Sequence, residues 1–235
     1  MLDFFTASEL SALGLSLKVA LVATLWTVPP GIAMAWVLAR LRFPGHALLN
    51  AIVHLPLVLP PVVTGYVLLI GFGRNGFLGR ALETCCGLVF AFRWTGAALA
   101  AAIMAFPLVV RAIRLSIEAV DTRLESAAGT LGANPLWVFL TITLPLCLPG
   151  VIAGAILGFA KSMGEFGATI TFVSNIPGET QTISAAIYTL TQVPGGDAAA
   201  YRLYFPISAI VALEAFQPTP SSHVTGRAAT AVLAL

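Results

Sequence analysis

The chain has 235 residues, of which 58% are hydrophobic and only 9% are charged, and its formal net charge is +2. Soluble domains carry about 25% charged residues, so this composition excludes a water-soluble fold. The small net charge gives no indication of nucleic acid as a partner. Lipid satisfies no backbone N–H or C=O group, and the apolar stretches are too continuous for barrel strands. We therefore expect an all-α, polytopic transmembrane helical bundle.

Apolar stretches near the ~20-residue length needed to cross hydrocarbon occur at five places. They lie at residues 10–38, 47–70, 95–117 and 144–163, and from about residue 201 onward. Pro29-Pro30 and Pro60-Pro61 predict a kink or break in the first two, because proline removes a helical hydrogen bond. Such breaks either line a conduction path or are bends in a packed bundle, and the residues alone leave both interpretations open.

The C-terminal end departs from the pattern of the other spans. Its apolar run from residue 203 is interrupted by Pro206 and followed by Glu214, and the polar, turn-forming run QPTPSSH comes next. The final apolar stretch is too short to span a membrane. We predict a transmembrane domain over residues 1–216 and an atypical, poorly packed tail over residues 217–235.

The connection at residues 118–143 predicts a short, exposed helix. Thr122 and Glu125 have the spacing of a capping box, in which each side chain satisfies a free amide at the helix start. Gly132 suits the left-handed position just after a helix. Four residues at i, i+3, i+4 and i+7 form one apolar face: Leu124, Ala127, Ala128 and Leu131. Small side chains would let a protein partner approach this face closely, and the alternative is an ordinary amphipathic helix at the membrane interface.

Two parts of the sequence resemble the permease subunits of bacterial ABC importers. In the connection, the spacing of Ala127-Ala128, Gly132 and Ile142-Thr143-Leu144-Pro145 is similar to the EAA loop, the coupling helix that docks into the ATPase in that family. The stretches FPGHALLNAIVHLPLVLPPVVTGYVLL, FPLVVRAIRLSIEAVD and GEFGATITFVSNIPGETQT resemble molybdate permease subunits, and the likeness covers about residues 10–205. Ser126 and Gly129 depart from the family pattern, which often has Glu or Gln and a basic residue at these positions.

The resemblance implies a type I ABC importer permease-like fold of about five spans that moves an oxyanion. Molybdate is the expected substrate, and sulfate and tungstate are the alternatives. The implied partners are a second copy of this chain, two cytoplasmic ATPase subunits, a periplasmic oxyanion-binding protein and the lipid of the bacterial inner membrane. The N-terminus would lie outside and the coupling loop in the cytoplasm. The implied coupling residues are Thr122, Leu124, Glu125, Ala127, Ala128, Leu131 and Gly132.

A translocation path or gate is expected near the fourth span. Lys161 and Glu165 stand four apart and could form a local ion pair, which is the alternative to a functional role for Glu165. The resemblance favours a structural place at the gate for Glu165, since a carboxylate would repel an oxyanion. Hydroxyl and amide groups suit a path because a transporter must release what it carries. The other candidates are Thr64, Ser162, Thr169, Thr171, Ser174 and Asn175.

We expect the chain to be no enzyme, because it has no G-x-x-x-x-G-K-[ST] loop to hold phosphates. ATP and Mg²⁺ would be used by the partner ATPase, and this chain would bind no cofactor. The histidines lack H-E-x-x-H spacing and the cysteines fit neither a disulfide framework nor a zinc site, so no metal site is expected. The rival is an ATP-independent channel, which would explain broken helices but leave the exposed loop helix without a role.

Overall fold

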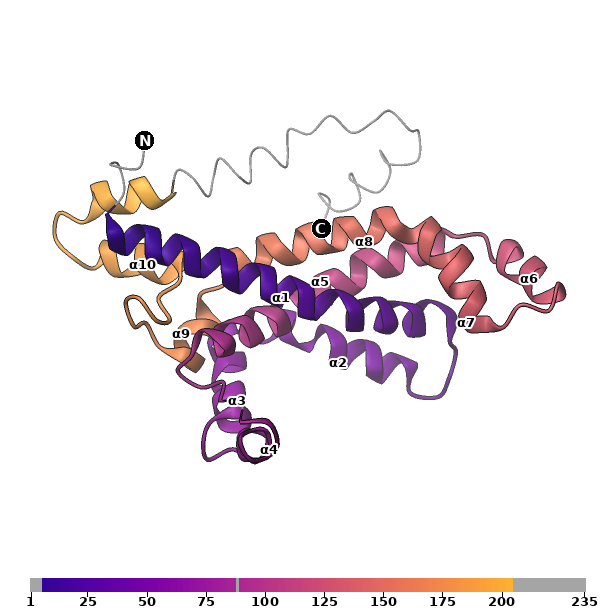
Figure 1. Ribbon diagram of the computed structural model, residues 1–235, viewed down its shortest axis with the longest axis horizontal. Coiled ribbons are helices and arrows are strands. Elements are labelled where there is room, and N and C mark those ends of the chain that lie inside the picture. Colours follow the sequence, from indigo (N-terminus) through magenta and orange to yellow (C-terminus); the bar gives the residue numbers. More distant parts are fainter. Residues whose placement is uncertain (1–5, 88, 205–235) are drawn as a thin grey trace.

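The computed structural model describes residues 6–87 and 89–204, and the regular elements in these ranges are helices. Within these two ranges, three helical stretches are long and apolar enough to cross a membrane: α1 (Ala7–Arg40), α5 (Trp94–Ala119) and Pro135–Met163. They run side by side along the length of the molecule (Figure 1). A fourth candidate span consists of α2 (His46–Val58) and α3 (Pro61–Phe72), which are bent by 111° at the break between them.

Helix α5 is the centre of the bundle. Half of its 26 residues are buried, and its inner faces are rich in short side chains: Gly96, Ala97, Ala98, Ala100, Ala101, Ala102 and Ala105. Both α1 and α8 (Leu144–Met163) pack along it. Short side chains permit this close approach. The resulting van der Waals contacts stabilise the helix pairs, because no hydrophobic effect drives helices together inside lipid.

Glycines on α8 face α5 at four-residue spacing. A side chain added at Gly154 would meet Ile113 at 3.2 Å, and one added at Gly158 would meet Val109 at 2.7 Å. Gly150 lies in the same row, against Ser116. This small-residue row lets the two helix backbones lie close together in the middle of the bundle.

The two pairs of prolines have different effects on the continuity of their helices. Helix α1 continues for 34 residues through Pro29 and Pro30, so the break expected there does not occur. In the second apolar segment the chain does break, because Pro60 and Pro61 begin α3 and cannot continue α2. The bend sends α3 and α4 (Phe77–Cys86) away from the long helices (Figure 1).

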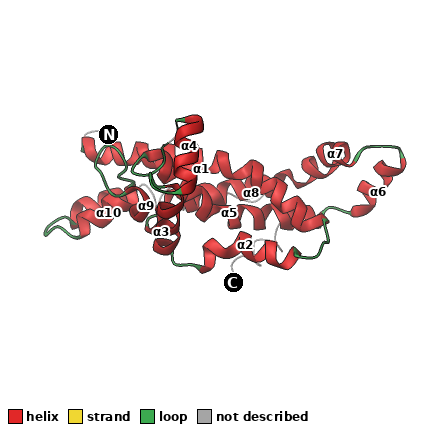
Figure 2. Ribbon diagram, turned by 90° about the horizontal axis from the view of Figure 1, so that it is seen from below, coloured by secondary structure: helices red, strands yellow, loops and turns green. Residues whose placement is uncertain are grey.

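The fourth span begins earlier than predicted. Residues 135–143, which we expected to lie in the connection, are helical: α7 (Pro135–Val138) leads into a π-helix, η2 (Phe139–Thr143), and then into α8. Pro135 fits the first turn of α7, and the Asn134 side chain accepts a hydrogen bond from the Leu136 amide at 3.0 Å. The connection proper is therefore α6 (Thr122–Thr130) and a short turn, and it lies at one end of the molecule (Figure 2).

The opposite end contains α9 (Gly167–Val173), α10 (Ile183–Thr191) and a helical segment at residues 197–204. Helix α10 is fastened to α1, because the Ser16 hydroxyl accepts from the Ile183 amide at 2.7 Å. Helix α9 was not predicted, and its Phe172 is fully buried. The predicted tail at residues 217–235 lies outside the described residues, as does most of the expected fifth span.

Contact between α3 and α9 depends on Gly65, which gives the first prediction. A Cβ atom at this position would lie 2.9 Å from Ala168 Cα and 3.0 Å from Thr171 Cβ. We expect Gly65→Ala to destabilise the folded protein by about 1–3 kcal/mol through overpacking. The matched control is Gly71→Ala on the same helix, where an added Cβ meets nothing within 4 Å. Thermal unfolding in detergent measures both, and equal midpoints for the two variants would contradict this packing account.

Candidate functional site

Helix α6 presents its apolar face to the surroundings. None of its residues is buried, and Leu124 and the adjoining Leu131 are 49% and 89% exposed. Ala127 is exposed and Ala128 is half-buried, so the four residues of the predicted face form one accessible surface. An apolar face of this kind at the end of a bundle is typical of a surface that meets another protein or lipid.

The predicted capping box at the start of α6 is wrong. The N-cap residue is Asp121, whose side chain accepts from the Arg123 amide at 2.9 Å, and Thr122 is the first helical residue. Aspartate is a stronger N-cap than threonine, so Asp121 was the better of the two adjacent candidates. The Glu125 carboxylate is also absent from the helix start, because it accepts hydrogen bonds from other elements.

The predicted end of α6 is confirmed. Gly132 has φ of 85°, the left-handed conformation that glycine adopts most readily. Its amide donates to Gly129 O at 3.0 Å, and the next amide, of Ala133, donates to Ala128 O at 3.2 Å. These two bonds form a Schellman motif, which satisfies the last carbonyls of the helix and fixes its end.

Glu125 joins α6 to two long helices. Its Oε1 atom accepts from Arg40 Nη2 at 3.0 Å and from Arg40 Nε at 3.2 Å, at the end of α1. The Thr143 hydroxyl, at the end of the π-helix, donates to the same oxygen at 2.7 Å. Arg40 Nη2 also donates to Val120 O at 3.1 Å. We call Arg40, Glu125 and Thr143 the α6 junction.

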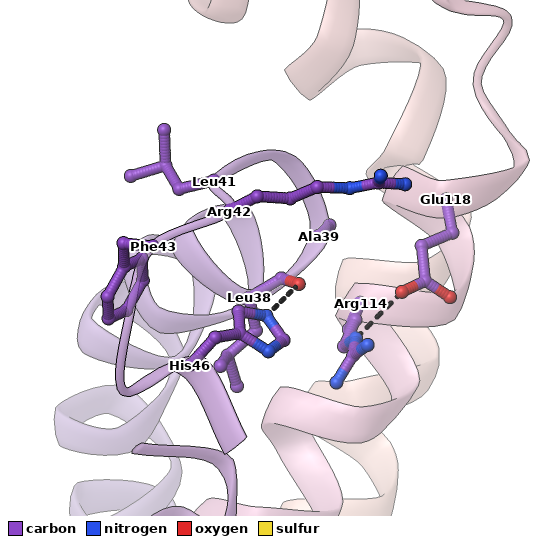
Figure 3. Close-up of a pocket in the computed structure, with 8 residues that line it drawn as sticks. All are labelled: Leu38, Ala39, Leu41, Arg42, Phe43, His46, Arg114 and Glu118. Carbon is purple, nitrogen blue, oxygen red and sulfur yellow. Dashed lines mark hydrogen bonds and ion pairs between the residues drawn. The ribbon is translucent and has the colours of Figure 1, made fainter. Parts of the chain in front are cut away.

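A pocket of about 400 Å³ lies beside the turn that follows α1 (Figure 3). Within its wall, Arg114 donates to Glu118 at 2.7 Å and to Asn50 Oδ1 at 3.0 Å, and His46 Nε2 lies 3.0 Å from Leu38 O. No predicted path residue lines it, so it is separate from the expected path. Its lining residues are Leu38, Ala39, Leu41, Arg42, Phe43, His46, Arg114 and Glu118.

Glu165 lies between α8 and α9, and its side chain is only 1% exposed. Its Oε2 atom accepts from Lys161 Nζ at 2.8 Å, so the two side chains form the local ion pair that the sequence offered as the alternative to a functional role. Its Oε1 atom accepts from the Ala168 amide at 3.0 Å, so the carboxylate also satisfies the start of α9. The negative charge is therefore neutralised and hydrogen-bonded within the protein.

The predicted path residues divide into two groups. The Thr169 hydroxyl donates to Phe166 O at 2.9 Å and to Glu165 O at 3.3 Å, and the Thr171 hydroxyl donates to Gly167 O at 2.9 Å. These groups are satisfied within α9 and its start. By contrast, Thr64 Oγ1, Ser162 Oγ and Asn175 Oδ1 are buried and have no hydrogen-bond partner within the described part of the chain. They lie on three different parts of the fold: on α3, on α8 and after α9.

Ser174 ends α9 in a strained conformation. Its φ is 68° and its ψ is −163°, a region that is almost exclusive to glycine. Such strain persists where surrounding structure holds it and it clusters at functional sites. The next residue, Asn175, donates from Nδ2 to the Thr189 hydroxyl of α10 at 2.8 Å, which links this strained corner to α10.

Three side chains that position or cap α6 were not identified from the sequence. They are Arg40, Asp121 and Thr143. Asp121 carried a usable signal, since aspartate just before a helix is a favoured cap. Arg40 and Thr143 carried none, because their partner Glu125 lies 85 and 18 residues away along the chain.

The chain belongs to the family of inner membrane components of binding-protein-dependent transport systems, whose profile matches residues 28–213. It is 62% identical over 198 residues to the molybdenum transport system permease protein ModB of Escherichia coli K12, covering 84% of this chain and 86% of the relative. It is 39% identical over 182 residues to the sulfate transport system permease protein CysT of Salmonella typhimurium, covering 77% and 65%.

A solved structure shares the fold. A bacterial ABC transporter involved in the import of alginate has a chain that matches with a TM-score of 0.69 at 19% sequence identity, covering 89% of this chain and 77% of that one. The bundle is thus the fold of an ABC importer permease. Family and apolar helices together define a multi-pass inner membrane protein that acts as a transport permease subunit.

The double role of Glu165 gives the second prediction. Glu165→Gln keeps an oxygen for the Ala168 amide and removes the charge, whereas Glu165→Ala removes both contacts. We expect Glu165→Ala to destabilise the protein by about 1.5–3 kcal/mol, the range for a hydrogen bond to a charged group, and Glu165→Gln to cost less. Thermal unfolding in detergent measures this, and a Gln variant as unstable as the Ala variant would contradict the capping role.

Proposed function

We propose that this chain is the membrane-spanning permease of an ATP-driven importer that carries molybdate across the inner membrane. The observation that carries the proposal is α6, a helix with no buried residue and a fixed end, positioned by an ion pair to the bundle. A helix that only covered the bundle would bury side chains against it, and α6 buries none. The choice of molybdate rests on the 62% identity to a relative named as a molybdenum permease.

The proposed assembly contains two copies of this chain, two cytoplasmic ATPase subunits and a periplasmic oxyanion-binding protein. The α6 end faces the cytoplasm and meets the ATPase through Leu124, Ala127, Ala128 and Leu131. The end with α10 and the start of α1 faces outward. ATP and Mg²⁺ belong to the ATPase, because this sequence has no phosphate-binding loop of its own.

Transport in this assembly is a switch between two arrangements of the bundle. ATP binding brings the ATPase subunits together, and the helices docked on them move with them. An equilibrium between inward-open and outward-open bundles shifts because the ATPase interacts differently with each. This chain contributes the two-state element and makes or breaks no bond.

Chemistry favours hydroxyl groups as the contacts of the oxyanion. Molybdate accepts hydrogen bonds, and the hydroxyls of Thr64 and Ser162, which have no partner among the described residues, can donate to it. Asn175 is less suited, because its Nδ2 already donates to Thr189, whose own hydroxyl donates to Ala185 O at 2.9 Å. The Glu165 charge does not repel the anion strongly, because Lys161 balances it.

Cells that lack their own molybdate permease but keep its ATPase and binding protein test this function. Expression of this chain should restore molybdenum accumulation, measured by mass spectrometry of washed cells, and tungstate should compete. Excess sulfate should leave it unchanged. Unchanged molybdenum accumulation together with increased sulfate uptake would contradict the proposal and favour the sulfate alternative.

The fixed end of α6 gives a further prediction. Gly132→Val places a β-branched residue at positive φ, which costs about 1–2 kcal/mol and should loosen the helix end. We expect uptake to fall severalfold at normal abundance in the membrane. Gly129→Val is the matched control, since both positions have open space around an added Cβ but only Gly132 has positive φ. Equal uptake by the two variants would show that the end of α6 plays no part in coupling.

A further inference from the structure

The α6 junction stands apart from the docking face of the same helix. Leu124 and Leu131 point outward, whereas the Glu125 side chain is 20% exposed and its Arg40 partner 15% exposed. We infer that Glu125 is a positioning residue that fastens α6 to α1 and to the start of the fourth span. A displacement of α6 is thereby transmitted to the long helices of the bundle. This inference rests on the proposed function, and it differs from a role for Glu125 as an ATPase contact.

The geometry makes the junction a three-way connection. One carboxylate oxygen receives two N–H groups from the end of α1 and one hydroxyl from the end of the π-helix, all within 3.2 Å. Hydrogen bonds to a charged group are shorter and stronger than neutral ones. Moving α6 away from either partner therefore breaks charge-assisted bonds, whereas moving all three together breaks none.

The contacts of the α6 junction are costly to break because its side chains are largely buried. Thr143 is 1% exposed, so its hydroxyl has no water to replace Glu125 if α6 moves alone. A charge pair that is largely withdrawn from water is costly to break, because one partner is left uncompensated. Arg40 is also held by Val120 O, the residue after α5, so the third long helix shares the connection.

The π-helix is the part of the fourth span to which a displacement of α6 is transmitted. Its five residues, Phe139–Thr143, interrupt the regular α-helical pattern between α7 and α8. Such irregular turns are frequent at functional sites. The end of α1 meets it twice: Trp36 contacts Phe139 edge-on at 5.9 Å between ring centroids, and Arg40 reaches Thr143 through Glu125. A displacement of α6 is therefore transmitted to the point where the fourth span departs from a regular α-helix.

Two variants isolate the junction from the docking face. Thr143→Val removes only the buried hydroxyl and keeps the shape of the side chain. Thr141→Val is its matched control, because Thr141 lies in the same π-helix but is exposed and donates to Trp137 O. Glu125→Gln removes the charge and keeps an acceptor. Each variant is reconstituted with the ATPase subunits and binding protein, and three quantities are measured: co-purified ATPase, ATP hydrolysis and molybdate moved per ATP.

We expect Thr143→Val and Glu125→Gln to retain the ATPase subunits and to hydrolyse ATP, while molybdate moved per ATP falls about tenfold, in line with a lost hydrogen bond to a charged group. Thr141→Val should match wild type. Loss of the ATPase from Glu125→Gln, or a wild-type transport ratio in both junction variants, would overturn the inference. The wild-type complex tests the proposed function separately, since a wild type that moves no molybdate contradicts that function.

Discussion

Close packing of α1 and α8 against α5 is the constraint on which the rest of the structure depends. Inside lipid, helices gain no hydrophobic free energy by meeting each other, so their association depends on close packing of their backbones and on polar contacts between them. Alanines on α5 and the glycine row on α8 meet this requirement. The three long helices therefore form one packed block, with α6 at one end and α9 and α10 at the other (Figure 2).

Ion pairs fasten the smaller elements to both ends of this block. Arg40–Glu125 holds α6, Lys161–Glu165 holds the start of α9, and Arg202–Glu9 holds residues 197–204 against α1. Each of these carboxylates also accepts a hydrogen bond from a hydroxyl or an amide, from Thr143, from Ala168 and from Thr6 respectively. Charged groups near lipid are retained when they are paired and hydrogen-bonded in this way. A displacement at either end is therefore shared with the long helices.

Much of this arrangement was predictable from the sequence, for physical reasons that differ between elements. Long apolar runs locate the spans because lipid demands them, and Gly132 marks the end of α6 because few other residues tolerate positive φ. The start of the fourth span and the short helix α9 were missed, because Pro135 fits equally a turn or a first helical turn and Gly167–Val173 is too short to show a period. The α6 junction could not be predicted from the sequence, because its three residues are distant from one another along the chain.

In the proposed mechanism, a partner that hydrolyses ATP powers transport through α6. Proteoliposomes containing this chain and the ATPase subunits, with molybdate-loaded binding protein outside and ATP sealed inside, test it most directly. Accumulated molybdate is measured with ATP, with a non-hydrolysable analogue, and with the ATPase left out. We expect accumulation against a gradient only with ATP and the complete assembly. Equal entry without ATP or without the ATPase would contradict it and identify the chain as a channel.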